Sequence, residues 1–309
     1  MPPPNVTVFG SHPLLGITIE KRGEDQDDVH MHPAGQGVWV ARMAAELGSH
    51  PILCGFIGGE TGTVLRPLLD TVDAELRLVD AHAAAGCYVV DRRSGEREIM
   101  ATAWSDPPSR HEIDDLFSVT VAAALESEVL VVCGGVPQDA LPLEIYGNLV
   151  ADARAGGTKT VVDLSPPGLN SALEGGPDFV KLDDWQLAEF LEGPATEPEQ
   201  LRTGARRVVE QGAGCVMVTR GGNPALIGTR DKLMELVPPR FSKGASEGSG
   251  DSMVGALAAS LARGKSMEEA LRWGAAAGAA NFLRKGLGTG SRDVVSDLLP
   301  RVELRELTD

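Results

Sequence analysis

The sequence predicts an α/β protein built in three layers, in which a mostly parallel sheet is covered by helices on both faces. From about residue 110 onward, short apolar segments alternate with segments of helical periodicity. Residues 129–133 and 215–219 carry no charge, which is typical of parallel strands buried on both faces. With 309 residues, 42% of them hydrophobic, the chain can form one large domain of this kind. Ligands of such sheets bind at the carboxyl ends of the strands.

The individual elements follow from apolar runs, glycines and turn residues. The expected strands are residues 6–9, 51–58, 129–133, 160–163 and 215–219. The expected helices are residues 35–48, a segment ending near Leu69, residues 141–155, a segment starting after Gly250, and residues 267–283. Residues 17–33 are polar with short alternating stretches, and residues 87–91 and 97–101 flank Ser94-Gly95 as in a β-hairpin.

Composition excludes several classes of partner. The chain has 28 Lys and Arg against 44 Asp and Glu, a net charge of −16, which argues against nucleic acid or an anionic membrane surface. The four cysteines are scattered without a C-x-x-C pair, so we expect reduced thiols rather than disulfides or a zinc site. No leader-like segment and no 18-residue apolar run occurs, so a cytoplasmic protein is expected.

One loop combines the features needed to handle phosphate. Gly248, Ser249 and Gly250 are small residues whose backbone N–H groups can approach an anion closely. A helix starts directly after them, and its N-terminus favours negative charge. Asp251 lies at this junction, where a carboxylate can act as a base on a substrate hydroxyl. The alternative is that Asp251 only caps the helix.

A second phosphate-like motif is discarded. Gly264-Lys265-Ser266 ends like a P-loop, but the first glycine of that motif would fall on Ala259, within an apolar helical run. Gly264 is therefore interpreted as the end of the helix.

Residues 248–255, Gly-Ser-Gly-Asp-Ser-Met-Val-Gly, resemble the C-terminal signature of the ribokinase-like carbohydrate kinases of the phosphofructokinase B type. The resemblance is greatest to the branch with 1-phosphofructokinase and tagatose-6-phosphate kinase, and it spans the whole chain. It implies one ribokinase-like domain over residues 1–309, with a small β-sheet lid inserted at about residues 14–33 and 85–103. It also implies transfer of the γ-phosphate of ATP, with Mg²⁺, to a sugar hydroxyl. Gly248, Ser249 and Gly250 would form the anion hole, and Asp251 would be the general base.

The resemblance also assigns residues to the nucleotide and the metal. Lys181 matches the lysine near the nucleotide phosphates, and Thr219 and Gly221 match the nucleotide loop. Small residues leading to Asn281 on the helix 267–283 would admit an adenine; the alternative is that they only let this helix pack tightly. Asp183 and Gln186 stand where the family has an Asn-x-x-Glu pair that organises Mg²⁺, so Asp183 is a candidate metal ligand. The alternative role for Asp183 is the N-cap of the next helix.

The acceptor side departs from the family pattern. Gly16 replaces an aspartate that binds acceptor hydroxyls, Gln36 replaces a lysine, and Trp39 replaces an asparagine. An arginine of the family's phosphosugar kinases is missing near residues 84–87. The lost cations argue against a phosphorylated acceptor. The expected acceptor-binding residues are His12, Gly16, Gly35, Gln36, Gly37 and Trp39; for Trp39 a wall or core position is the alternative.

Two hypotheses of function remain. The first is an ATP-dependent kinase acting on a sugar or sugar-like alcohol through an altered acceptor pocket. The second is a non-catalytic sensor that keeps the fold and binds a nucleotide or metabolite, which the changed Asn-x-x-Glu pair favours and the retained Asp251 disfavours. By analogy with the family, the lid would also join two copies of the chain in a homodimer.

Overall fold

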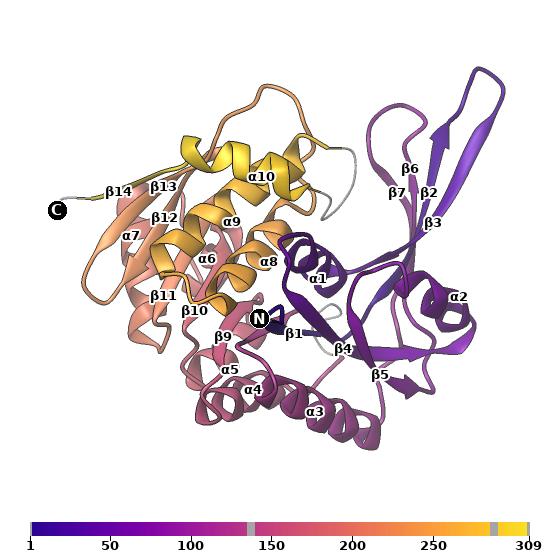
Figure 1. Cartoon of the computed structure of the whole chain (residues 1–309), viewed down its shortest axis with the longest axis horizontal. Coiled ribbons are helices and arrows are strands. Elements are labelled where there is room, and N and C mark those ends of the chain that lie inside the picture. The colour runs from indigo at the N-terminus through magenta and orange to yellow at the C-terminus, as the bar shows by residue number, and fades with distance from the viewer. Residues whose placement is uncertain (1, 135–139, 285–289, 308–309) are drawn as a thin grey trace.

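A ten-stranded sheet forms the centre of the part of the chain described by the computed structural model, residues 2–134, 140–284 and 290–307 (Figure 1). Its strands are β1 (Asn5–Gly10), β4 (His50–Gly58), β5 (Glu75–Ala81), β8 (Val129–Cys133), β9 (Lys159–Asp163), β10 (Phe179–Asp183), β11 (Cys215–Arg220), β12 (Asn223–Thr229), β13 (Leu233–Val237) and β14 (Glu303–Glu306). Their order is β14-β13-β12-β11-β10-β9-β8-β1-β4-β5.

The pairing is parallel from β5 to β11 and antiparallel from β11 to β14. A mostly parallel sheet is therefore confirmed. Its central strands are buried on both faces because their side chains are almost all apolar, as in Val129–Cys133. Parallel pairing brings the carboxyl ends of β1, β8, β9 and β10 to one edge, where the site lies.

Helices cover both faces of this sheet and divide the core in two. One face carries α1 (Gln36–Glu46), α2 (Gly59–Leu69), α8 (Ser249–Ala262), α9 (Met267–Phe282) and α10 (Arg292–Leu298), followed by a 3₁₀ turn at Leu299–Arg301. The other face carries α3 (Arg110–Leu125), α4 (Glu144–Ala155), α5 (Gly168–Glu174), α6 (Asp184–Leu191) and α7 (Pro198–Glu210). The α/β/α layering is thus confirmed.

The lid is a separate four-stranded sheet in the order β3-β2-β6-β7. Its strands are β2 (Leu14–Lys21), β3 (Asp27–Ala34), β6 (Cys87–Asp91) and β7 (Glu98–Ala103). It projects from the body beside α1 and α2 (Figure 1). β3 leads directly into α1, so the lid and the body are joined next to the site.

Several boundaries differ from expectation. α4 begins at Glu144 rather than Leu141, because residues 141–143, with Pro142 among them, form an irregular segment before it. β5 was not expected, because the half-buried edge strand carries charged residues. Gly264 directly follows α8 with φ 75°, as expected for a residue ending a helix. The four cysteines are free thiols. In the described ranges, no helix has the length and apolar character needed to cross a bilayer.

Candidate active site

The loop before α8 presents the start of a helix to the carboxyl edge of the sheet. Gly248 is the residue before the helix and has φ 74°, a conformation that favours glycine. Asp251 is the third residue of α8, and no side chain caps this helix. The alternative, in which Asp251 only caps the helix, is therefore wrong. Its carboxylate instead lines a pocket at the sheet edge.

Behind this loop, Asn281 holds the loop in place. Its amide Nδ2 donates to the carbonyl oxygen of Glu247 at 2.8 Å and to Oγ of Ser249 at 3.3 Å. Asn281 is fully buried and does not line either of the pockets at the site. The structure thus corrects its expected contact with the nucleotide, because its side chain is used to support the loop.

A buried group of opposite charges lies beside Asp251. The ammonium of Lys181 is 3.0 Å from Oδ1 of Asp183 and 3.6 Å from Oδ1 of Asp163. Only 5% of Lys181 and 2% of Asp163 is exposed. Thr219 donates its hydroxyl to Oδ1 of Asp183. Burial lowers the pKa of Lys181, but the neighbouring carboxylates outweigh this effect and raise it, so the lysine stays charged.

Asp251 has a pKa suited to a base at neutral pH. Burial, together with the negative charges of Asp163 and Asp183, raises its pKa to about 7, although the positive charge of Lys181 opposes this shift. The pKa of Asp163 is also raised, chiefly by burial. A carboxylate with a pKa near 7 is the kind that accepts a proton efficiently in a catalytic site.

Two pockets meet at the N-terminus of α8. The first, here called the charged pocket, has a volume of about 350 Å³ and is lined by Asp163, Lys181, Asp183 and Asp251, with Gln36, Ser165 and Gln186. The second, the α9 pocket, has a volume of about 760 Å³ and is lined by residues of β11–β13, α8 and α9, including Thr219, Gly221, Phe241, Ala275, Gly278 and Phe282. Asp183, Trp185, Ser246 and Gly250 line both.

Gly250 allows the lysine to reach the loop. A Cβ atom on Gly250 would lie 3.1 Å from Nζ of Lys181, closer than such atoms normally approach. A side chain at position 250 would therefore push the ammonium away from the first turn of α8 by a few tenths of an ångström. The junction of the two pockets therefore combines backbone N–H groups, one cation and one carboxylate of raised pKa, which suits transfer of a phosphoryl group.

Sequence comparison agrees with this chemistry. The chain matches the pfkB family carbohydrate kinases over residues 6–293. It is 32% identical to the ATP-dependent 6-phosphofructokinase isozyme 2 of Escherichia coli over 268 residues, which cover 84% of this chain and 85% of that protein. The chain belongs to the pfkB family of carbohydrate kinases. It is therefore an enzyme of the phosphotransferase class with an alcohol group as acceptor.

Other members of the family are similar over nearly their full length. The 1-phosphofructokinase of Bacillus subtilis is 27% identical, covering 89% of each chain. A structure of phosphofructokinase-2 from Escherichia coli in complex with fructose-6-phosphate superposes with a TM-score of 0.82 at 28% identity, over 96% of this chain and 99% of that one. The ribokinase of Arabidopsis thaliana, at 20% identity and a TM-score of 0.74, shares the fold over 97% and 99% of the two chains. The ribokinase-like fold is thus confirmed.

In this pfkB-family kinase, the expected nucleotide residues divide between the pockets. Thr219 and Gly221 line the α9 pocket, and Gly221 has φ 58° in the turn between β11 and β12. Lys181 lies in the charged pocket. Ser249 and Gly250 line the α9 pocket, whereas Gly248 and Gly250 line the charged pocket.

The metal expectation rests on Asp183 alone. In the described parts of the chain, no group of three or more His, Cys, Asp or Glu side chains is arranged to hold an ion. Asp183 is the residue before α6, and its backbone N–H donates to Oε1 of Gln186 at 2.7 Å, so it also has the expected N-cap position. Asp183 lines both pockets, and one carboxylate there fits Mg²⁺, which is typically held by few protein ligands together with phosphates and water.

Of the six expected acceptor residues, only Gln36 reaches the charged pocket. A Cβ atom on Gly37 would lie 2.6 Å from Cα of Gly10, so this glycine lets α1 pack on β1. Gly35, with φ 103°, starts α1 next to the backbone of His12. Trp39 is half-buried and packs against Tyr88 and Val90 of the lid, which is the wall position weighed above.

His12 and Gly16 lie elsewhere. His12 lines a small separate cavity with Phe56, and burial lowers its pKa to about 4, so it is neutral at physiological pH. Gly16 lies in β2 beneath the imidazole of His32, whose Cε1 would be 2.3 Å from a Cβ atom at that position. His32 therefore occupies the space of the side chain that Gly16 lacks.

Among the residues that line the charged pocket, Asp163 and Trp185 were not assigned to the site from the sequence. Asp163 ends the buried strand β9, and this position at a carboxyl end was an available signal. Trp185 is 57% exposed at the rim shared by both pockets, and no motif in the sequence marks it.

Proposed function

We propose that this pfkB-family kinase transfers the γ-phosphate of ATP to a hydroxyl of a sugar or sugar-like small molecule, with Asp251 as the general base. The observation that carries this proposal is the position of Asp251, a carboxylate with a pKa near 7 in the first turn of α8, where the two pockets meet. The α9 pocket would hold the nucleotide, and the charged pocket would receive the reacting groups.

In the proposed reaction, Asp251 takes the proton of the acceptor hydroxyl. The acceptor oxygen forms a bond to the γ-phosphorus, and the bond from that phosphorus to the bridging oxygen of ADP breaks. The backbone N–H groups of the first turn of α8 and the ammonium of Lys181 would stabilise charge on the transferred group. Mg²⁺ bound to the nucleotide phosphates would neutralise part of their charge, with Asp183 as its protein ligand.

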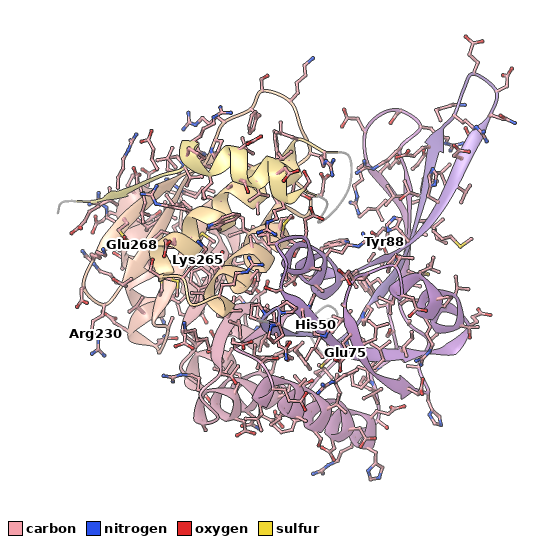
Figure 2. All side chains as sticks on the ribbon, in the orientation of Figure 1. His50, Glu75, Tyr88, Arg230, Lys265 and Glu268 are labelled. Atoms are coloured by element: carbon pink, nitrogen blue, oxygen red, sulfur yellow. The ribbon has the colours of Figure 1, made fainter. Side chains whose placement is uncertain are left out.

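The acceptor pocket of this chain would differ from that of its relatives. His32 fills the space next to Gly16, and the ring centroids of His32 and Tyr88 are 6.3 Å apart. The guanidinium of Arg97 lies 5.7 Å from the centroid of the Tyr88 ring, and Tyr88 lies where the lid joins the body (Figure 2). Positive charge is thus present on the lid although the family's lysine and arginine are not, so the charge of the acceptor must be measured.

The test is ADP release from Mg-ATP across fructose 1-phosphate, fructose 6-phosphate, tagatose 6-phosphate, free hexoses, pentoses and nucleosides. We expect turnover of one class that falls about 10³-fold in Asp251→Asn, within the range for loss of a general base. The matched control is Asp152→Asn, an exposed carboxylate on α4 away from both pockets, whose turnover should stay within a few-fold of wild type. ATP binding without turnover of any acceptor would refute the kinase and favour the sensor.

We also propose that two copies of the chain pair through the lid. Val29 and Met31 on β3, at the edge of the lid sheet, are 59% and 55% exposed, and their side chains share a face because they are two residues apart in a strand. Sedimentation should give a dimer that Met31→Asp converts to a monomer. Leu125→Asp, at an equally exposed apolar residue on α3, should leave the dimer intact. A monomeric wild type would contradict the proposal.

A further inference from the structure

Gln36 uses both ends of its amide to join three elements. Its Oε1 accepts a hydrogen bond from the backbone N–H of Gly134 at 2.8 Å, and its Nε2 donates to Oδ2 of Asp163 at 2.8 Å. A backbone N–H can only donate and an ionised carboxylate can only accept, so these partners fix the orientation of the amide. The first residue of α1 is thereby tied to the carboxyl ends of β8 and β9.

The contacts that start at Gln36 continue from Asp163 to Lys181. Asp163 receives Gln36 on Oδ2 and faces Nζ of Lys181 on Oδ1, at 3.6 Å. Both Asp163 and Lys181 are almost completely buried. Water therefore does not replace a lost partner easily, and a buried charge deprived of a hydrogen bond costs considerable free energy.

This series of contacts ends at the loop before α8. Nζ of Lys181 lies against Gly250, where a Cβ atom would be only 3.1 Å away. The interactions thus run from Gln36 through Asp163 and Lys181 to the turn that would hold the transferred phosphate. Each step is a contact of a buried or half-buried side chain, and none of them involves the acceptor.

We propose that Gln36 is a positioning residue for phosphoryl transfer: by holding Asp163, it keeps the ammonium of Lys181 against Gly250. This inference rests on the proposed kinase function. It also replaces the expectation that Gln36 binds the acceptor. A neutral side chain suits the role, since a second cation at position 36 would compete with Lys181 for Asp163.

Substitutions at positions 36 and 163 test this hydrogen-bond geometry. Gln36→Glu keeps the acceptor for Gly134 N–H but sets a carboxylate against Oδ2 of Asp163, and Gln36→Met removes both hydrogen bonds without adding charge. We expect kcat to fall about 10- to 100-fold in each, with KM for the acceptor changed less than twofold. In the double variant Gln36→Glu, Asp163→Asn, the amide and the carboxylate have exchanged places. The new amide at position 163 can donate a hydrogen bond to the new carboxylate at position 36, and the pair still carries one negative charge. We therefore expect kcat to recover to within about fivefold of wild type.

The outcomes separate positioning from binding and from folding. Gln211→Glu, on the exposed end of α7, is the control for adding a carboxylate and should change neither constant. A raised KM for the acceptor with unchanged kcat would show that Gln36 contacts the acceptor and would overturn the proposal. A double variant no better than Gln36→Glu, with the melting temperature of wild type, would overturn it as well.

A measurement of ATP affinity tests the role of Gln36 without requiring turnover. By calorimetry, Gln36→Glu and Gln36→Met should bind ATP at least fivefold more weakly than wild type, because Lys181 loses its position, and should bind adenosine equally well. Equal ATP affinity in all three proteins would refute the positioning role. A wild type that binds ATP without phosphorylating any acceptor would refute the proposed function and leave this comparison valid.

Discussion

The turn at the start of α8 and the lid differ in whether their positively charged side chains are paired with carboxylates. At the turn, Lys181 is enclosed by carboxylates, and its partners are held by further hydrogen bonds. On the lid, Arg97 and the imidazole of His32 gather around the ring of Tyr88, and among the described residues neither Arg97 nor Arg42 of the adjoining α1 pairs with a carboxylate. The difference indicates that the first region is complete without a ligand, whereas the second has cations available for one.

The same two regions differ in how they keep the family pattern. The turn retains the glycines, the aspartate and the lysine of the resemblance, while the lid and the start of α1 replace an aspartate, a lysine and an asparagine. We infer that phosphoryl transfer limits sequence change at the turn more strongly than acceptor binding limits it at the lid and the start of α1. The following substitutions sharpen this contrast, beginning with the largest effect.

Removing the cation of the charged pocket should be the most damaging change. Lys181→Met leaves the buried Asp163 and the partly exposed Asp183 without a positive partner, and we expect the free energy of unfolding to fall by about 3 kcal/mol at pH 8. Urea unfolding followed by tryptophan fluorescence measures it. Lys159→Met, at an exposed position of β9, should cost less than about 0.5 kcal/mol. A small effect of Lys181→Met would mean that these carboxylates are already neutral.

The raised pKa of Asp251 should appear in both rate and stability. The rate constant kcat should fall about tenfold per pH unit below pH 7, because the base is then protonated. The ordinary pKa of 3.8 lies below the folded value of about 7, so ionisation of Asp251 costs stability as pH rises through this range. Asp251→Asn should therefore stabilise the protein by about 1–2 kcal/mol at pH 8 and by less at pH 5. A flat kcat between pH 5 and 8 would exclude Asp251 as the base.

Restoring an aspartate on the lid should be tolerated only with a second change. Gly16→Asp places its side chain in the imidazole of His32, and we expect a loss of about 1–3 kcal/mol in unfolding free energy. His32→Ala in the same chain should recover most of it, and thermal unfolding of the two variants measures the coupling. Additive losses would show that His32 does not fill this space.

The smallest effect is expected at His12. It lines a cavity apart from the two pockets and is uncharged above pH 5, so His12→Gln should change kcat/KM less than about twofold. Steady-state kinetics with the best acceptor decides this. A tenfold loss of kcat/KM would indicate that His12 contacts the acceptor. Substitutions on the lid side would then be as damaging as those at the turn.

The sequence predicted the sheet, the layers and the turn of α8 because each has a local signal. Apolar strands such as Val129–Cys133 and the run Gly248–Asp251 can be read without knowing their neighbours. The partners of Gln36 could not be predicted, since Gly134 and Asp163 are about 100 and 127 residues away and meet it only through the pairing of β1, β8 and β9. The burial of Asn281 and the placement of His32 over Gly16 depend on packing in the same way.

The excess of carboxylates around Lys181 couples ligand binding to protons in solution. Three carboxylates face one ammonium, and Asp251 is half-protonated near pH 7. In the proposed reaction, a nucleotide would bring further negative charge beside Asp251, so ATP binding would raise the proton affinity of this carboxylate and take up a fraction of a proton from the buffer. Mg²⁺ opposes this effect through its positive charge. The heat of ATP binding should therefore vary with the ionisation enthalpy of the buffer at pH 7, and less so when the metal is present.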